Sequence, residues 1–115
     1  MKRGEVYWAH LVPRSGSEQQ GRRPVVVISH DAFNQTSGWR SIIVLPLSTS
    51  TAQAGRGPSA VLLVRGAAGL GRESVVLCHQ ITTLDRSKLA QRIGELSAAE
   101  LIAVEDGLRA ALDLV

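Results

Sequence analysis

Short apolar runs rich in β-branched residues constrain the fold of this chain more than any other feature. The runs at residues 24–29, 41–47 and 74–79 are too short for a buried helix, and Val and Ile favour extended backbone. Each run is therefore expected to be a buried strand. Pro24 belongs at a strand start, and Pro46 at a strand end or on a sheet edge, because proline donates no ladder hydrogen bond.

The remaining strands are expected where apolar residues alternate or recur briefly. Residues 5–12 alternate loosely and predict a first strand, and residues 60–65 and 80–84 predict two more. Polar, glycine-punctuated stretches at 14–21 and 48–58 are expected to be loops, the second of them mobile. Strands at this spacing predict a small twisted antiparallel sheet rolled into a barrel, within one domain that spans the whole chain of 115 residues.

Only the end of the chain has a strongly helical pattern. Ser97 and Glu100 form a capping box, in which each side chain satisfies a backbone N–H of the first turn. A brief helical turn is expected at residues 31–35, capped by Asp31. The predicted fold class is therefore mainly β (α+β). After the capping box, apolar residues recur at helical spacing and predict the face packed on the sheet: Leu101, Val104, Leu108, Ala111 or Leu112, and Val115.

Charge is distributed unevenly along the chain. The formal net charge is +3, but residues 1–72 hold nine Lys and Arg against three Asp and Glu, whereas residues 73–115 hold four against seven. A basic N-terminal part attracts polyanions, of which nucleic acid is the commonest that a cytosolic domain meets. A solvated surface without a partner accounts for the charge equally well, so charge alone leaves both interpretations open.

The cysteine count and the hydropathy bear on the compartment. Cys78, the single cysteine, lies in an apolar run and is expected to be a small buried thiol in a reducing compartment. The segment at residues 1–5 is not an apolar signal core, and no apolar stretch approaches the length that spans a bilayer. We therefore expect a soluble, cytoplasmic protein that uses no membrane.

Familiar enzyme motifs are absent from the sequence. Residues 66–71 resemble a phosphate-binding glycine loop only in glycine content, since no helix is predicted to follow them, and a turn is expected. His10, His30 and His79 lie far apart, without Asp, Glu or Cys at ligand spacing, so neither a metal site nor a cofactor is expected. No nucleophile-elbow sequence marks a Ser/His/Asp triad.

The junction Arg22-Arg23-Pro24 is the strongest candidate for chemistry. Two permanent cations precede a stiff buried strand directly after a polar loop, and an arginine fork pairs bidentately with phosphate oxygens. The same arginines could instead be charged residues that keep an aggregation-prone strand soluble. The residues alone favour that structural interpretation by about two to one.

Aromatic residues are scarce, since Tyr7, Trp8, Phe33 and Trp39 are all there are. Platforms that stack RNA bases need several exposed rings, so an RRM or OB type of domain is disfavoured. Trp8 is expected in the core, and Trp39 on the surface.

Several stretches together resemble the MazF/PemK/Kid toxins of bacterial toxin–antitoxin pairs. The resemblance covers nearly the whole chain in order, and the pairing of Gly16-Ser17-Glu18-Gln19 with Arg23-Pro24 is highly specific. The resemblance therefore favours a catalytic role for Arg23 over the structural one. The other matching stretches are Lys2 to Trp8, Gln20 to Val27, Asp31 to Asn34, Val44 to Ser50 and Gln80 to Asp85.

The resemblance implies an SH3-like barrel with short helices and a C-terminal helix, a homodimer, and a groove that binds single-stranded RNA. It also implies metal-independent, sequence-specific cleavage through the RNA 2′-hydroxyl, and neutralisation by an antitoxin whose acidic, disordered C-terminal segment occupies the groove. The family's catalytic arginine falls on Arg23 and its hydroxyl on Ser48, where most relatives have Thr, so either Ser48 or Thr49 is expected to face the phosphate.

His79 stands where some relatives carry an acidic residue, and it is either a proton-transfer group or a strand or interface histidine. The remaining residues expected to contact RNA or position its loops are Lys2, Arg3, Ser17, Glu18, Gln19, Gln20, Arg22, Arg56 and Gln80.

Two rival functions share these features. Gyrase-poisoning toxins have the same barrel and bind a protein without chemistry, but here the Arg23-Pro24 element is intact. A nuclease-dead RNA-binding domain is the second alternative, for which Ser48 in place of Thr is the only hint. The RNA sequence that is cut, and the class of RNA, do not follow from the residues.

Overall fold

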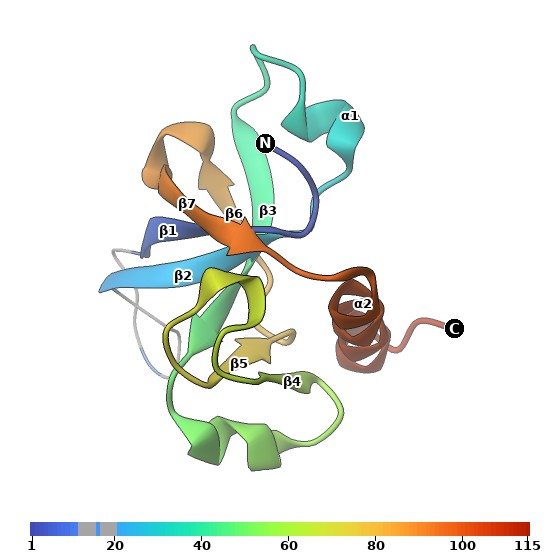
Figure 1. The fold of residues 1–115 in the computed structure, drawn as a ribbon. Helices are drawn as coiled ribbons and strands as arrows, with labels where there is room; N and C mark the ends of the chain where they lie inside the picture. The colour runs from blue at the N-terminus through green and yellow to red at the C-terminus, as the bar shows by residue number, and fades with distance from the viewer. Residues whose placement is uncertain (12–15, 17–20) are drawn as a thin grey trace.

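The structure is a computed structural model that describes residues 1–11, 16 and 21–115, with the side chains of Thr51, Gln53 and Arg56 left out. Strands are its commonest element, and the longest helix is at the C-terminus (Figure 1). In chain order the elements are β1 (Glu5–Leu11), β2 (Gly21–Val27), α1 (Asp31–Asn34), β3 (Ser41–Ser48), η1 (Thr51–Arg56), β4 (Ala60–Leu63), η2 (Ala67–Gly69), β5 (Ser74–Leu77), β6 (Thr82–Asp85), η3 (Arg86–Lys88), β7 (Leu89–Glu95) and α2 (Ala98–Leu112).

The strands form a seven-stranded sheet in the order β4-β5-β3-β2-β1-β7, with β6 also paired to β3. All of the pairs are antiparallel. The predicted fold class, mainly β with a C-terminal helix, is confirmed. Among the described residues the pairs run as an open path from β4 to β7, so the sheet curls without the closure that the predicted barrel implies.

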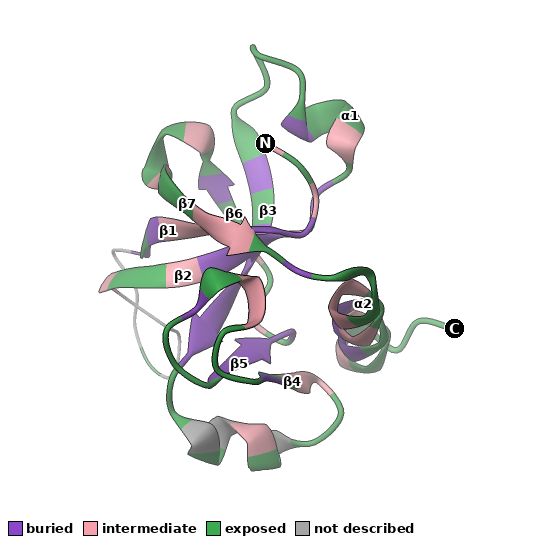
Figure 2. Cartoon of the chain, in the orientation of Figure 1, coloured by how far each residue is buried: buried purple, intermediate pink, exposed green. Residues whose placement is uncertain are grey.

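Both faces of the sheet are covered, which explains the unbroken apolar run in β2. Val25 and Val27 belong to one core cluster with Ile42 and Val44, whereas Val26 belongs to a second cluster on the other face. Successive side chains of a strand point to opposite faces, so a strand buried on both sides must be apolar at every position. Figure 2 shows the buried part of the sheet at its centre and the exposed ends of the strands at its rim.

Both prolines lie inside strands, so the prediction that they mark strand boundaries is wrong. β2 begins three residues before Pro24, which pairs with Trp8, whereas the pairing with β3 starts only at Val25. Pro46 lies within β3 at the place where its neighbour changes from β6, which ends opposite Val44, to β5. At each proline one side of the strand is unpaired, so no ladder hydrogen bond is lost.

The C-terminal helix is capped and packed as its sequence predicts. The Ser97 side chain accepts from the Glu100 N–H, and the Glu100 side chain accepts from the Ser97 N–H. Val104 is fully buried, and the sheet-facing stripe continues through Ala111 and not Leu112, which is half exposed. Gly107 is required because a Cβ there would lie 2.7 Å from the Cys78 sulfur, so α2 rests directly on the strand end.

Three local predictions are wrong. The short helix α1 is capped by His30, whose Nδ1 accepts from the Ala32 N–H, while Asp31 lies in its first turn. The stretch predicted as a mobile loop at 48–58 contains the 3-10 helix η1, and β7 was missed because Leu89–Glu95 is polar and largely exposed. Strand β7 forms because it pairs with β1 at the rim of the sheet, where only one face needs apolar cover.

Candidate active site

Arg23 and Ser48 lie two residues beyond the last pair of β2 and β3, and the alternation of side chains along each strand relates their faces. Val25 pairs with Pro46 and Val27 with Val44, and the same register continued for two residues sets Arg23 on the line of Ser48. Directly opposed residues of antiparallel strands project to the same side of the sheet. The two residues that the sequence proposed for catalysis therefore fall on the same face of the sheet, Arg23 at the exposed end of β2 and Ser48 at the buried end of β3.

Ser48 is held in position, and its hydrogen remains available. The side chain is buried, and its Oγ accepts a hydrogen bond of 3.1 Å from the Ser50 N–H. A hydroxyl that accepts in this way can still donate its own hydrogen. A phosphate oxygen beside Arg23 is a suitable acceptor for that hydrogen.

Thr49 faces the other side of the sheet. It is exposed and lines a pocket of about 230 Å³ together with Trp8, Pro24 and Arg72. Trp8 pairs with Pro24 on the face opposite to Arg23, because neighbours along a strand alternate between faces. The geometry thus favours Ser48 over Thr49 as the hydroxyl that acts with Arg23.

Arg22 lies on the same face as Thr49 and stacks on an aromatic ring. Its guanidinium carbon is 4.2 Å from the centroid of the Trp8 ring. Trp8 is only half buried, so the prediction that it belongs to the core is wrong. β1 and β2 extend past β3 at this end of the sheet, and the ring lacks a third strand to cover it.

His79 and Gln80 lie in the turn between β5 and β6. β5 pairs with β3 from Leu47 onward and β6 pairs with it up to Val44, so this turn lies beside β3 between these two residues, close to Ser48. His79 is exposed, and its Nε2 is 3.5 Å from the Gln80 amide nitrogen. The structure therefore brings this histidine to the strand that carries the site, at a level two to four residues from Ser48 along that strand.

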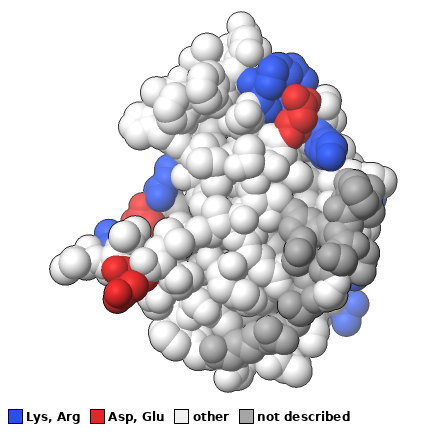
Figure 3. Space-filling view, turned by 180° about the vertical axis from the view of Figure 1, so that it is seen from behind, with Lys and Arg blue, Asp and Glu red and all other residues white. Residues whose placement is uncertain are grey.

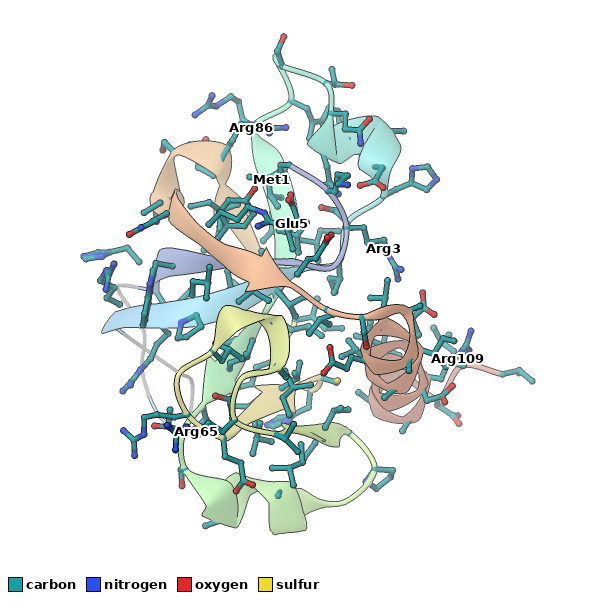
Figure 4. The ribbon with its side chains drawn as sticks, viewed as in Figure 1. Met1, Arg3, Glu5, Arg65, Arg86 and Arg109 are labelled. Atoms are coloured by element: carbon teal, nitrogen blue, oxygen red, sulfur yellow. The ribbon has the colours of Figure 1, made fainter. Side chains whose placement is uncertain are left out.

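The N-terminal cations are not part of this cluster. Gly4 bonds to Val27 at the far end of β2, so Lys2 and Arg3 lie about four residues, or ~13 Å, along the strand from Arg23. Arg3 is occupied there by an ion pair of 2.6 Å with Glu105 of α2. Figure 4 shows Arg3 directed toward α2.

A buried carboxylate organises the same N-terminal region. Glu5 accepts hydrogen bonds from the Arg92 side chain at 2.6 Å, from the Tyr7 hydroxyl at 3.1 Å and from the Lys2 N–H. Burial by itself would raise the pKa of Glu5, but these hydrogen bonds outweigh it and leave the pKa below its ordinary value. Burial, and then the bond to Glu5, raise the pKa of Tyr7. This cluster holds the fold together and is not directed at a ligand.

Other predicted residues are not placed. Ser17, Glu18, Gln19 and Gln20 lie outside the described residues, as does the side chain of Arg56.

Within residues 1–11, 16 and 21–115, no three His, Cys, Asp or Glu side chains gather as metal ligands would. Burial raises the pKa of the Cys78 thiol to about 11. None of the helices described is long and apolar enough to cross a membrane.

Sequence reasoning missed one part of the site, a pocket of about 360 Å³ beside Arg22. It is lined by Trp8, His10 and Lys88, among others. The signal that could have found it is the alternation of β1, which puts Trp8 and His10 on one face, but only the pairing with β2 and β7 shows that Arg22 and Lys88 meet them.

The fold and this arrangement define a class: a small antiparallel β-sheet protein in which a projecting strand end carries two arginines and a neighbouring strand carries a buried hydroxyl. The family model of PemK-like, MazF-like toxins of type II toxin–antitoxin systems matches residues 2–112. The chain belongs to this family.

Individual relatives agree with that assignment. Endoribonuclease MazF6 of Mycobacterium tuberculosis is 40% identical over 114 residues, which are 99% of this chain and 98% of that protein. The crystal structure of MazF from Deinococcus radiodurans aligns with a TM-score of 0.78 at 32% identity, over 99% of this chain and 97% of that one. A MazE–MazF crystal structure from the same organism aligns with a TM-score of 0.73 at 30% identity, over 100% and 98%.

Proposed function

We propose that this toxin is an endoribonuclease that cuts single-stranded RNA at a site centred on Arg23 and Ser48. The observation that supports the proposal is the alternation along β2 and β3, by which Arg23 and Ser48 fall on one face of the sheet. The membership in a toxin family with relatives named as endoribonucleases supports the same chemistry.

The proposed reaction uses the RNA's own 2′-hydroxyl. The 2′-oxygen attacks the adjacent phosphorus and gives up its proton, and the bond from phosphorus to the 5′-oxygen breaks as that oxygen takes a proton. The products are a 2′,3′-cyclic phosphate and a 5′-hydroxyl. No metal is needed in this scheme, because Arg23 neutralises the negative charge that develops on the nonbridging oxygens.

Two further side chains complete the proposal. Ser48 donates its hydrogen to a nonbridging oxygen, with its own oxygen held by the Ser50 N–H. His79, which is exposed on the turn after β5, is proposed as a proton-transfer group, and its alternative role is a structural one in that turn. Gln80, Arg22, Thr49 and the segment 17–20 are proposed to contact RNA on either side of the cut.

The proposed partners follow from the family. We propose a cognate antitoxin, since MazF of Deinococcus radiodurans is solved together with MazE and the family model describes toxins of toxin–antitoxin systems.

We also propose a homodimer. Large apolar side chains that a second copy could cover include Ile43, Leu62, Val64 and Ile81, each at least 37% exposed. Apart from the grey residues, the broad middle of the face in Figure 3 shows neither charge, which suits such contact. We also propose a cytoplasmic location, where an RNA substrate is available.

The test is digestion of a mixed single-stranded RNA pool by the purified protein, with and without a chelator, followed by analysis of the new ends. Cuts that resist the chelator and end in 2′,3′-cyclic phosphate are expected. Binding without cuts would identify a nuclease-dead RNA-binding domain, and neither binding nor cuts would favour a toxin that acts on a protein. Cuts that need a divalent metal would refute the mechanism and leave the endoribonuclease assignment.

A further inference from the structure

The Trp8–Arg22 pair forms one wall of a pocket that the proposed chemistry does not use. The Arg22 guanidinium lies over the indole at 4.2 Å from its centroid. An arginine stacked on a ring keeps its N–H donors directed outward in its own plane, and the ring limits the rotation of the side chain. Arg22 is therefore oriented before any ligand arrives.

A second cation faces Arg22 across the same pocket. The pocket, of about 360 Å³, is lined by Lys88 from η3 as well as by His10, which pairs with Arg22 across β1 and β2. Among residues 1–11, 16 and 21–115, no Asp or Glu contributes to its lining. Two permanent cations beside an aromatic ring favour an anion that also presents a flat group.

The pocket and the proposed catalytic face lie on the two sides of the same two-stranded end of the sheet, formed by β1 and β2. Arg22 and Arg23 are consecutive, so their side chains point to opposite faces of β2, and residues 21–24 of β2 pair with β1 and not with β3 among the described strands. A single-stranded polymer that passes this end of the β1–β2 pair can therefore contact both faces of β2. Figure 1 shows the free ends of β1 and β2 extending from the sheet, on the side away from α2.

We propose that this pocket binds the phosphate of a nucleotide next to the cleaved bond, with Arg22 and Lys88 as its cationic ligands and Trp8 as the residue that positions Arg22. The proposal rests on the endoribonuclease function above and extends it to a second phosphate of the same RNA strand. The base of that nucleotide lies toward the exposed part of the Trp8 ring.

The test uses an RNA oligonucleotide with one mapped cut and its analogue with a 2′-deoxy sugar at that cut, which binds without being cleaved. Dissociation constants for the analogue are measured over a range of salt, and kcat and KM for the cleavable form. Arg22→Gln and Lys88→Gln are each expected to raise the Kd about tenfold, as loss of a charge-assisted hydrogen bond does. Each should also lower the slope of log Kd against log salt by about 0.7 and leave kcat within about twofold.

Trp8 is tested through its effect on Arg22. Trp8→Leu should raise the Kd about as much as Arg22→Gln does, and the double variant should be no weaker than Arg22→Gln alone, since Trp8 acts through Arg22. Trp8→Phe should restore part of the affinity, because it keeps a ring under the guanidinium. Fully additive losses would overturn the positioning role.

Arg109→Gln is the matched control, because it removes one charge from α2, on the opposite side of the molecule (Figure 4). It should leave both Kd and salt slope unchanged. Wild-type values for Arg22→Gln and Lys88→Gln, with cleavage intact, would overturn the pocket and leave the proposed function standing. A wild-type protein that neither binds nor cuts RNA would instead refute the proposed function.

Discussion

Arginines at the two ends of the β1–β2 pair have different surroundings. At the end near α2, Arg3 is bound to Glu105 and Arg92 to Glu5, each at 2.6 Å. At the projecting end, Arg22 lies over an indole, and the strand that carries it, β2, contains no acidic residue. The first set of cations is paired with carboxylates within the fold, whereas Arg22 contacts an aromatic ring, as suits the phosphate contact proposed above.

The difference shows how the same residue type stabilises one region and serves binding in the other. An ion pair in contact with a buried carboxylate satisfies both partners and leaves little potential outside. A cation held by a ring remains an electrostatic target, because the ring supplies orientation without a countercharge. Substitutions at the two ends should therefore separate activity from stability.

Arg23→Ala should have the largest effect, a loss of about 1,000-fold in kcat, because a charged donor to the transition state is removed. Its free energy of unfolding should change by less than about 0.5 kcal/mol, since the side chain is exposed at a strand end. Single-turnover cleavage and urea unfolding measure the two quantities. Near-normal cleavage would remove Arg23 from the mechanism, and a large loss of stability would move it into the class of Arg3 and Arg92.

Ser48→Ala should follow, with kcat reduced about 100-fold and KM little changed, because a neutral donor is lost. Thr49→Ala should reduce kcat much less, since Thr49 lies on the face opposite to Arg23. The pair of variants compares two neighbouring hydroxyls in one assay. A greater loss with Thr49→Ala would show that the register places the wrong hydroxyl at the phosphate.

Glu5→Ala should act in the opposite way, costing about 2 kcal/mol of unfolding free energy with kcat unchanged, because Arg92 and Tyr7 lose a buried acceptor. The folded pKa of Glu5 lies below its ordinary value, so its stabilisation is present above the unfolded pKa and is lost as pH falls through the folded pKa. Urea unfolding at neutral and acid pH checks both effects. Equal loss of stability for wild type and variant on acidification would contradict this assignment.

Arg3→Gln should have the smallest effect, about 0.5 kcal/mol of stability, because its ion pair with Glu105 is partly exposed. The KM for RNA should stay at the wild-type value if Arg3 serves the fold. A raised KM with unchanged stability would instead return Arg3 to the RNA path that the family resemblance suggested. Glu105→Gln is the control, since it breaks the same pair without removing a cation.

The elements that sequence reasoning found are those whose signal is local. The capping box of Ser97 and Glu100 lies within one helical turn, and the β-branched run at Val25–Val27 specifies a strand whatever its neighbours. β7 escaped notice because its sequence is polar and it owes its conformation to pairing with β1. Pro24 and Pro46 misled for a similar reason, since the cost of a proline depends on which side of the strand has a partner.

For the site, the residues and their motif pointed to Arg23 and to the pair Ser48 or Thr49, but not to the choice between the hydroxyls. That choice depends on which face each side chain takes. Trp8 and Lys88 carried no signal of their own, because they lie about 80 residues apart and meet only across the β1–β7 pair.

The chain by itself therefore determined the apolar strands, the C-terminal helix, the basic N-terminal part and the arginine before the buried strand. Tertiary structure alone decided that Arg23 and Ser48 fall on one face of the sheet, that Arg22, Trp8 and Lys88 line one pocket, and that Arg3 pairs with Glu105. The physical reason is that strand register is fixed by pairing over long separations in sequence, and a shift of one residue would exchange every side chain between the two faces.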